Sequence, residues 1–111
     1  MNRISYSDFE RVDVRVGEIV EAKEFAEAKN PSYRLKVDFG NVLGIKNSSA
    51  HITNYKKEEL VGKQVIAVVN FPPKQIANFI SEVLVLGVTD KDGTIRLLAP
   101  DKKVEAGVRM F

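Results

Sequence analysis

The sequence predicts an all-β domain in which five strands close into a small barrel. Short apolar segments rich in Val and Ile are separated by turn residues about every ten positions, which is typical of a barrel or a sandwich. The first segment is unusually long and contains a glycine, as expected of a strand that bends sharply. A single short helical segment in mid-chain favours a barrel over a sandwich.

Composition limits the classes of protein to which the chain can belong. Its 111 residues suit one domain, residues 1–111, with 44% apolar and 29% charged residues. No apolar run approaches the ~20 residues of a membrane span, and no apolar leader segment is present. We therefore expect a cytoplasmic protein without membrane insertion. Cysteine is absent, and the net charge of +2 means that a nucleic acid would have to meet a local basic patch.

The first predicted strand covers residues 12–25. Val14 and Val16 alternate with polar residues, but the alternation slips after Gly17, because Ile19 and Val20 are adjacent apolar residues. A glycine at the point where the apolar–polar alternation shifts by one residue predicts a β-bulge, which lets a long strand bend.

The second predicted strand, residues 33–39, follows the turn at residues 30–32 and separates two faces. The apolar face, which we expect in the core, carries Tyr33, Leu35, Val37 and Phe39. The polar face carries Arg34, Lys36 and Asp38. Gly40 and Asn41 predict a hairpin turn into a third strand over residues 42–52.

A short helix over residues 54–60, capped by Asn54 and ending near Gly62, follows the third strand. Further strands are predicted over residues 64–70, 82–88 and, after the Asp92–Gly93 turn, 94–99. This order favours a five-stranded Greek-key OB-fold barrel with a short mid-chain helix and terminal extensions.

Two segments do not alternate as a half-solvated antiparallel strand should. Residues 65–69 and 83–86 are continuous apolar runs, which indicates burial on both faces. Either a second copy of the chain covers the outer face, giving a homodimer, or the helix and the termini do so.

The polar side of the second and third strands is the first candidate binding surface. Strands two and three of OB folds commonly carry the nucleic-acid platform. Lys and Arg side chains there would contact phosphates, and Ser and Asn would bond phosphate or 2′-hydroxyl oxygens. The candidate RNA-binding residues on these strands are Arg34, Lys36, Lys46, Asn47, Ser48 and Ser49. The alternative is a solvated strand face without a partner.

The loop over residues 71–80 is the second candidate. Asn70 and Ser81 bracket it and Lys74 adds a cation, so these three residues either contact RNA or cap the loop backbone. Large apolar residues in a loop either plug the core or line an exposed groove. The candidate peptide-binding residues are Phe71, Pro72, Ile76 and Phe79.

Catalysis is not expected. His51 is the only histidine, which argues against a catalytic triad or a histidine metal site within one chain. No glycine-rich phosphate-binding pattern occurs, and we expect neither a cofactor nor a metal.

Four stretches, taken together, resemble the tRNA-binding domain family between Asp8 and Val88. They are DFERVDVRVGEIVEA, PSYRLKVDFG, SSAHITNYKKEELVGKQVIAVVNFPP and SEVLVLG. The resemblance implies an OB fold, a homodimer and binding of tRNA through shape and backbone contacts, and Arg34 matches a family lysine. The run IAVVNFPPKQIANFISEVLVLG is similar to the CsaA branch of export-related chaperones, which implies binding of unfolded or presecretory polypeptides.

Two positions depart from the tRNA-binding pattern of the synthetase appendices. The turn before the second strand is only residues 29–32, where those proteins have a longer loop. Val83 and Leu84 stand where those proteins have Gly and Met after the serine that matches Ser81.

Overall fold

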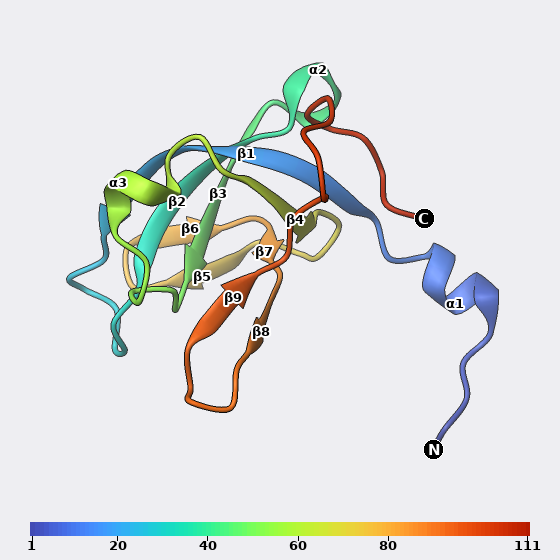
Figure 1. The fold of residues 1–111 in the computed structure, drawn as a ribbon, viewed down its shortest axis with the longest axis horizontal. Coiled ribbons are helices and arrows are strands. Elements are labelled where there is room, and N and C mark those ends of the chain that lie inside the picture. Colours follow the sequence, from blue (N-terminus) through green and yellow to red (C-terminus); the bar gives the residue numbers. More distant parts are fainter.

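The longest strand, β1 (Val14–Glu24), organises the sheet because it pairs with two different strands along its length. Its first half pairs with β4 (Gln64–Val68) and its second half with β2 (Tyr33–Asp38), both antiparallel. The computed structural model describes residues 1–111 and extends this sheet with β3 (Ile45–Ala50) and β7 (Leu84–Val85). The strand order is β3-β2-β1-β4-β7, and the curved sheet nearly closes on itself (Figure 1). The predicted all-β five-stranded barrel is confirmed.

The bulge in β1 lies at Val20, three residues beyond its predicted position at Gly17. The register with β2 shifts between Ile19 and Glu21, whereas Gly17 pairs regularly with Val65. The bulge falls here because Ile19 and Ala22 both pack on the core, which leaves two intervening residues outside.

Gly17 serves a different purpose. A Cβ at this position would lie 2.5 Å from Val37 Cγ1 and 2.8 Å from Phe39 Cε1. The missing side chain therefore lets β1 pass close over the apolar face of β2.

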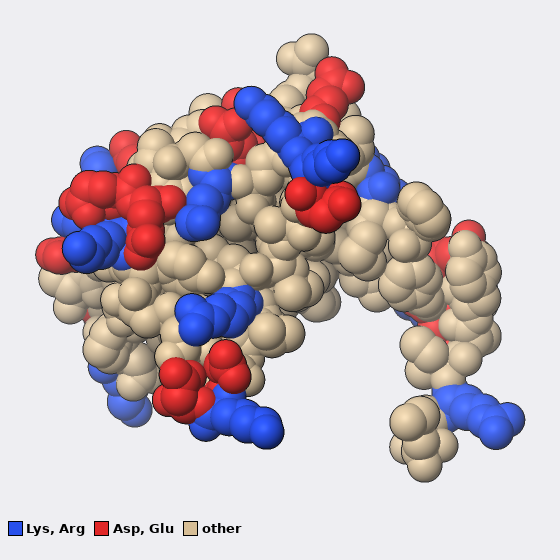
Figure 2. Space-filling view, viewed as in Figure 1, with Lys and Arg blue, Asp and Glu red and all other residues tan.

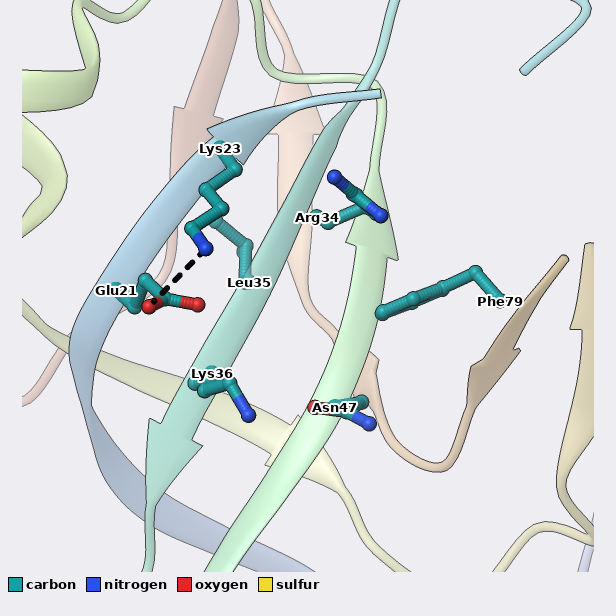
Figure 3. A pocket seen from close by; sticks show the side chains of 7 residues that line it. All are labelled: Glu21, Lys23, Arg34, Leu35, Lys36, Asn47 and Phe79. Atoms are coloured by element: carbon teal, nitrogen blue, oxygen red, sulfur yellow. Dashed lines mark ion pairs between the residues drawn. The ribbon is translucent and has the colours of Figure 1, made fainter. Parts of the chain in front are cut away.

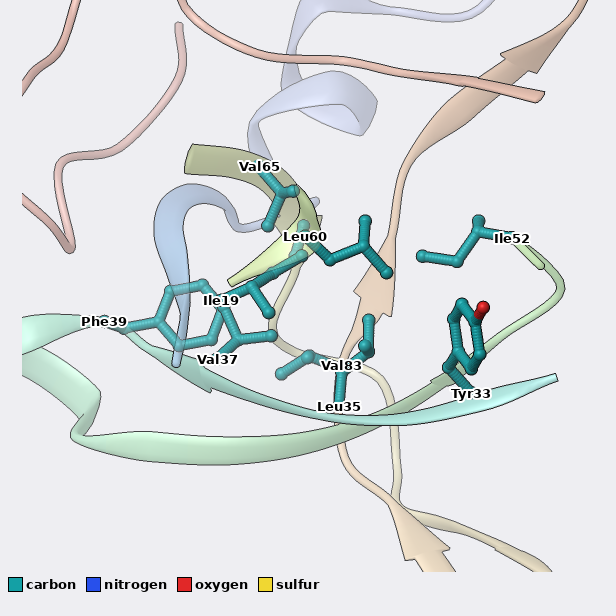
Figure 4. Close-up of a cluster of buried hydrophobic side chains, with 10 residues drawn as sticks. Ile19, Tyr33, Leu35, Val37, Phe39, Ile52, Leu60, Val65 and Val83 are labelled. Atoms are coloured by element: carbon teal, nitrogen blue, oxygen red, sulfur yellow. The ribbon is translucent and has the colours of Figure 1, made fainter. Parts of the chain in front are cut away.

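The core is one cluster of buried side chains inside the barrel (Figure 4). It contains the predicted inward face of β2 and residues from the other strands, from α3 and from the loops: Ile19, Tyr33, Leu35, Val37, Phe39, Ile52, Leu60, Val65, Ala67 and Val83. Full burial of an aliphatic or aromatic side chain contributes about 1.5–3 kcal/mol each, so this cluster is the main source of stability. The one hydroxyl in the cluster, that of Tyr33, donates to the carbonyl of Tyr55 at 2.8 Å.

Barrel closure joins β3 to the segment before β7. The backbone N–H groups of Glu82 and Val83 both donate to the carbonyl of Asn47, at 2.8 and 3.3 Å. The N–H of Asn47 in turn donates to a carboxylate oxygen of Glu82 at 3.0 Å. Because three of the closing hydrogen bonds involve Asn47, its position is central to how the two edges of the sheet meet.

Helix positions differ from the predictions at two places. The connection predicted as a hairpin turn is a short helix, α2 (Gly40–Leu43), because the Asp38 carboxylate accepts the N–H of Gly40 and starts a helical turn. Strand β3 therefore begins at Ile45 rather than at residue 42. Helix α3 (Lys57–Leu60) is not capped by Asn54, whose side-chain amide instead donates to the carbonyl of Ile95.

The predicted strand over residues 82–88 is broken into two. After β7 the chain leaves the barrel sheet at Leu86 and forms β8 (Gly87–Thr89). This strand pairs with β9 (Ile95–Leu97) in a separate hairpin. The predicted Asp92–Gly93 turn connects them. The N–H of Thr94 donates to the Asp92 carboxylate at 2.9 Å, and this hydrogen bond lowers the pKa of Asp92.

The loop over residues 71–80 contains a hairpin that the sequence did not predict. Strand β5 (Lys74–Ile76) pairs with β6 (Phe79–Ser81), and Ala77 in the tight turn has a positive φ of 53°. Pairing starts only after the two prolines, which cannot donate to a ladder.

The chain ends extend beyond the barrel and lie on the same side of it (Figure 1). A short N-terminal helix, α1 (Tyr6–Glu10), is stabilised by a capping box in which Ser5 and Asp8 bond each other's backbone N–H groups. The C-terminal segment pairs with β1: Gly107 and Met110 donate to Val16 and Val14, and Val16 donates to Val108. None of the helices is long and apolar enough to cross a membrane.

Candidate nucleic-acid interface

The candidate RNA-binding surface is the outer face of β1, β2 and β3. Strand pairing places Arg34 between Lys23 and Ser49, and places Lys36 between Glu21 and Asn47. Because side chains on a strand alternate between faces, these residues all project away from the core. Arg34, Lys36, Asn47 and Ser49 are thus brought together as the sequence predicted.

A cavity of about 210 Å³ opens on this face. It is lined by Glu21, Lys23, Arg34, Leu35, Lys36, Asn47 and Phe79 (Figure 3). Three of these residues are cationic and only one, Glu21, is acidic. The Glu21 carboxylate pairs with Lys23 at 3.7 Å. Arg34 and Lys36 have no ion-pair partner in the chain, so the cavity presents unneutralised positive charge.

Arg34 is held in place by an aromatic ring rather than by an acidic partner. Its guanidinium carbon lies 5.6 Å from the centre of the Phe25 ring. Its Nε is buried and has no hydrogen-bond acceptor. A buried N–H without a partner is costly, and an anion in the cavity would bind the terminal NH groups of the guanidinium instead.

Two predicted residues of the third strand do not belong to this surface. Ser48 is fully buried, and its hydroxyl donates to the carbonyl of Val83 at 3.0 Å. Lys46 has the same strand parity as Ser48, and its Nζ lies 3.8 Å from the Glu82 carboxylate. The predicted platform is corrected accordingly: a strand exposes alternate residues, so the run of four polar residues cannot all face outward.

The residues that bracket the hairpin make backbone hydrogen bonds. The side-chain amide of Asn70 accepts from the N–H of Asp13 at 3.0 Å and donates to the carbonyl of Arg11 at 2.8 Å. The hydroxyl of Ser81 accepts from the N–H of Ser49 at 3.2 Å. Both residues thus have the backbone-capping role that was the alternative to RNA contact.

The four predicted peptide-binding residues are divided between two places. Phe71 and Pro72 line a second cavity of about 300 Å³, together with Lys74, Ser81, Glu82, Val83 and Leu84. Phe79 instead lines the basic cavity, and Ile76 lines neither. The hairpin packs on the outside of the barrel against β3, so it is not a core plug.

The sequence reasoning missed Glu21 and Lys23. Placing the bulge at Gly17 left the orientation of these two residues undefined. The sequence did contain a signal for the true position of the bulge. Two residues separate the apolar Ile19 and Ala22, and a bulge at Val20 lets both of these face the core and directs Lys23 to the outer face.

No three His, Asp or Glu side chains lie close enough together to hold a metal ion. The only histidine, His51, has its Nδ1 within 3.0 Å of the Ser32 hydroxyl and 3.3 Å of the Pro31 carbonyl, in the turn before β2.

These features define the protein as an OB-type barrel with a basic outer face. Residues 14–109 match the family model described as "Putative tRNA binding domain". The chain belongs to this tRNA-binding domain family.

Among curated relatives, the chain is 37% identical to the methionine–tRNA ligase of Methanocaldococcus jannaschii over 115 residues. The match covers 99% of this chain and 17% of that ligase. The chain therefore corresponds to one small part of that enzyme, and the similarity does not bring ligase activity to it.

Three solved structures match over nearly their entire length. The CsaA chaperone of Picrophilus torridus is 59% identical with a TM-score of 0.93, covering 98% of this chain and 100% of that one. The chaperone CsaA of Bacillus anthracis is 46% identical with a TM-score of 0.92, covering 99% and 100%. A MetRS-related protein of Pyrococcus horikoshii is 28% identical with a TM-score of 0.88 over all of both chains.

The buried position of Ser48 leads to a test by substitution. Ser48→Ala removes the hydrogen bond to the Val83 carbonyl and should lower the free energy of unfolding by about 1–3 kcal/mol. Ser49→Ala, one residue further on the outer face, should change it by less than about 0.5 kcal/mol. Urea denaturation followed by circular dichroism measures both. Equal effects of the two substitutions would contradict the assignment of Ser48 to the barrel interior.

Proposed function

We propose that the chain binds structured RNA, with tRNA as the natural ligand, through the outer face of β1, β2 and β3. The observation that carries the proposal is the pair Arg34 and Lys36, adjacent cations that no acidic side chain neutralises. Membership of the tRNA-binding domain family supports the same partner. Such a protein would act in the cytoplasm, where mature tRNA is used.

Binding would rest on phosphate contacts positioned by the strands. Arg34 and Lys36 lie two residues apart along β2, and Lys23 is opposite Arg34 on β1, so the three cations form one cluster. Asn47 adds a neutral hydrogen-bonding group beside them. Phosphate contacts position RNA without reading its sequence, so we expect recognition of shape more than of sequence.

Charge reversal tests this surface. Arg34→Glu combined with Lys36→Glu should lower tRNA affinity at least about tenfold and reduce the salt dependence by about 0.7–0.9 log units per lost contact. Thermal stability should change little, because both side chains lie on the outer face. Filter binding or anisotropy across a salt series measures the effect.

Lys102→Glu combined with Lys103→Glu is the matched control, since it changes the net charge equally on the C-terminal segment. An equal loss in the control would mean that net charge, not the β2 surface, governs binding. Unchanged affinity in the Arg34/Lys36 variant would reject the surface altogether.

We further propose that the second cavity binds extended polypeptide. Phe71 is 53% exposed and lines the cavity beside the exposed Pro72. Exposed apolar residues gathered around a groove mark an interaction site. The similarity to two proteins titled as CsaA chaperones supports a polypeptide, such as an unfolded or presecretory chain, as the occupant.

Phe71→Asp should weaken binding of an apolar peptide about tenfold or more, because the carboxylate cannot replace the buried ring. The variant should remain folded, since the ring is half exposed. Val61→Asp is the control, because Val61 is 50% exposed near α3 and outside this cavity. Isothermal titration with a labelled apolar peptide measures both variants. Peptide affinity that is unaffected by Phe71→Asp would exclude the groove.

The outer face of β7 supports a homodimer. Val83 is buried in the core while the next residue, Leu84, stays exposed, so neither α3 nor the termini cover this side. Val88, just beyond β7, is also exposed. Packing of this face against a second copy would account for the continuous apolar runs in the sequence.

Sedimentation tests the assembly. At micromolar concentration we expect a species of twice the chain mass of 12.4 kDa. Leu84→Glu should shift it toward the monomer without unfolding the barrel, because Leu84 lies outside the core cluster. A single species of 12.4 kDa for the unsubstituted chain would reject the dimer.

A further inference from the structure

Phe79 occupies an unexpected position. Its sequence neighbours suggest a peptide groove, yet its side chain reaches from β6 toward the basic cavity (Figure 3). Arg34 and Lys36 lie along β2 on one side of it, with Asn47 on β3 between (Figure 3). The cavity therefore combines unneutralised cations with one half-buried aromatic side chain.

The ring is held in place from behind. Phe79 packs edge-on against Phe25 with ring centres 5.4 Å apart and an interplanar angle of 64°. Phe25 is only 3% exposed, and the Arg34 guanidinium lies over it. Hairpin pairing of Ile76 with Phe79 fixes the backbone at the same point. The aromatic side chain is thus ordered before any ligand arrives.

Double-stranded RNA would not stack on the Phe79 ring. Duplex RNA offers phosphates, sugars and a shallow minor groove to a protein, and its bases stay stacked on one another. An unpaired base exposes its π-face and stacks on aromatic side chains. The presence of an aromatic side chain beside phosphate-binding cations therefore favours a nucleotide that has left the helix.

The size of the cavity is compatible with one base. Its volume of about 210 Å³ corresponds to roughly seven water molecules at ~30 Å³ each, which suits one ring system and not a helix. Asn47 offers both a donor and an acceptor to the edge of such a base or to its ribose.

We propose that this cavity binds a single unpaired nucleotide of a structured RNA. Its base lies against the ring of Phe79, its phosphate lies between Arg34 and Lys36, and Asn47 bonds the base edge or the 2′-hydroxyl. This assignment rests on the proposed RNA-binding function and specifies which part of the RNA the site takes.

The test compares two RNAs of equal length and charge, a hairpin with an unpaired loop and a blunt duplex. Phe79→Leu keeps an apolar side chain against Phe25 but removes the aromatic face, and should weaken hairpin binding about fivefold to tenfold. Duplex affinity should change less than about twofold, because phosphate contacts remain. Phe9→Leu, an equivalent change on α1 outside both cavities, should leave both affinities unchanged.

Phe79→Trp provides the second variant and an independent signal. The chain contains no tryptophan, so the introduced indole is the only one, and a stacked base should quench its fluorescence. We expect wild-type hairpin affinity or better, with quenching by the hairpin and not by the duplex. Circular dichroism melts confirm that each variant is folded.

The outcomes separate the two proposals. Equal binding of hairpin and duplex, an equal loss for both RNAs in Phe79→Leu, or no quenching in Phe79→Trp would overturn the unpaired-nucleotide site while RNA binding stands. Failure of the unsubstituted protein to bind either RNA would overturn the proposed function and this inference with it.

Discussion

The barrel depends on how Asn47 closes it. Its carbonyl accepts two backbone N–H groups from residues 82 and 83, and its own N–H bonds the Glu82 carboxylate. One residue along, the buried Ser48 hydroxyl bonds the Val83 carbonyl. These contacts hold β3 against the segment that follows the β5–β6 hairpin, so the hairpin cannot shift relative to the outer face of β2. The geometry of the basic cavity, with Phe79 on one side and Arg34 on the other, follows from this closure.

The β5–β6 hairpin separates two surfaces of different chemistry. On one side, Phe79 faces cations of β1 and β2. On the other, Lys74 and Ser81 border a cavity that the exposed apolar side chains of Phe71 and Leu84 also line. Charged and apolar surfaces therefore lie in separate places on a domain of 111 residues. The space-filling view shows the same separation of charged and uncharged surface. Acidic and basic groups lie in small clusters with wide uncharged areas between them (Figure 2).

Alternation along β2 made the fold and half of the site predictable. Tyr33, Leu35 and Val37 had to face inward, so Arg34 and Lys36 had to face outward. Prediction failed where long-range packing decided the geometry. The bulge settled at Val20 because Ile19 and Ala22 both reach the core, and Ser48 turned inward to bond a carbonyl 35 residues away. The hairpin that carries Phe79 was not predicted, because the two prolines before it indicate a loop. The position of the Phe79 ring depends on its tertiary contact with Phe25, which the sequence does not reveal.

The pairing of the C-terminal segment with β1 has a consequence for how the protein behaves in a crowded solution. Strand β1 pairs with β2 only from Glu18 onward, so the stretch from Val14 to Val16 would present unpaired backbone groups along one side. Gly107, Val108 and Met110 occupy those groups instead. A strand edge that is already filled offers no template for the strand of another molecule, and edge-to-edge aggregation is thereby discouraged. The last few residues of the domain thus protect the solubility of the strand that organises its fold.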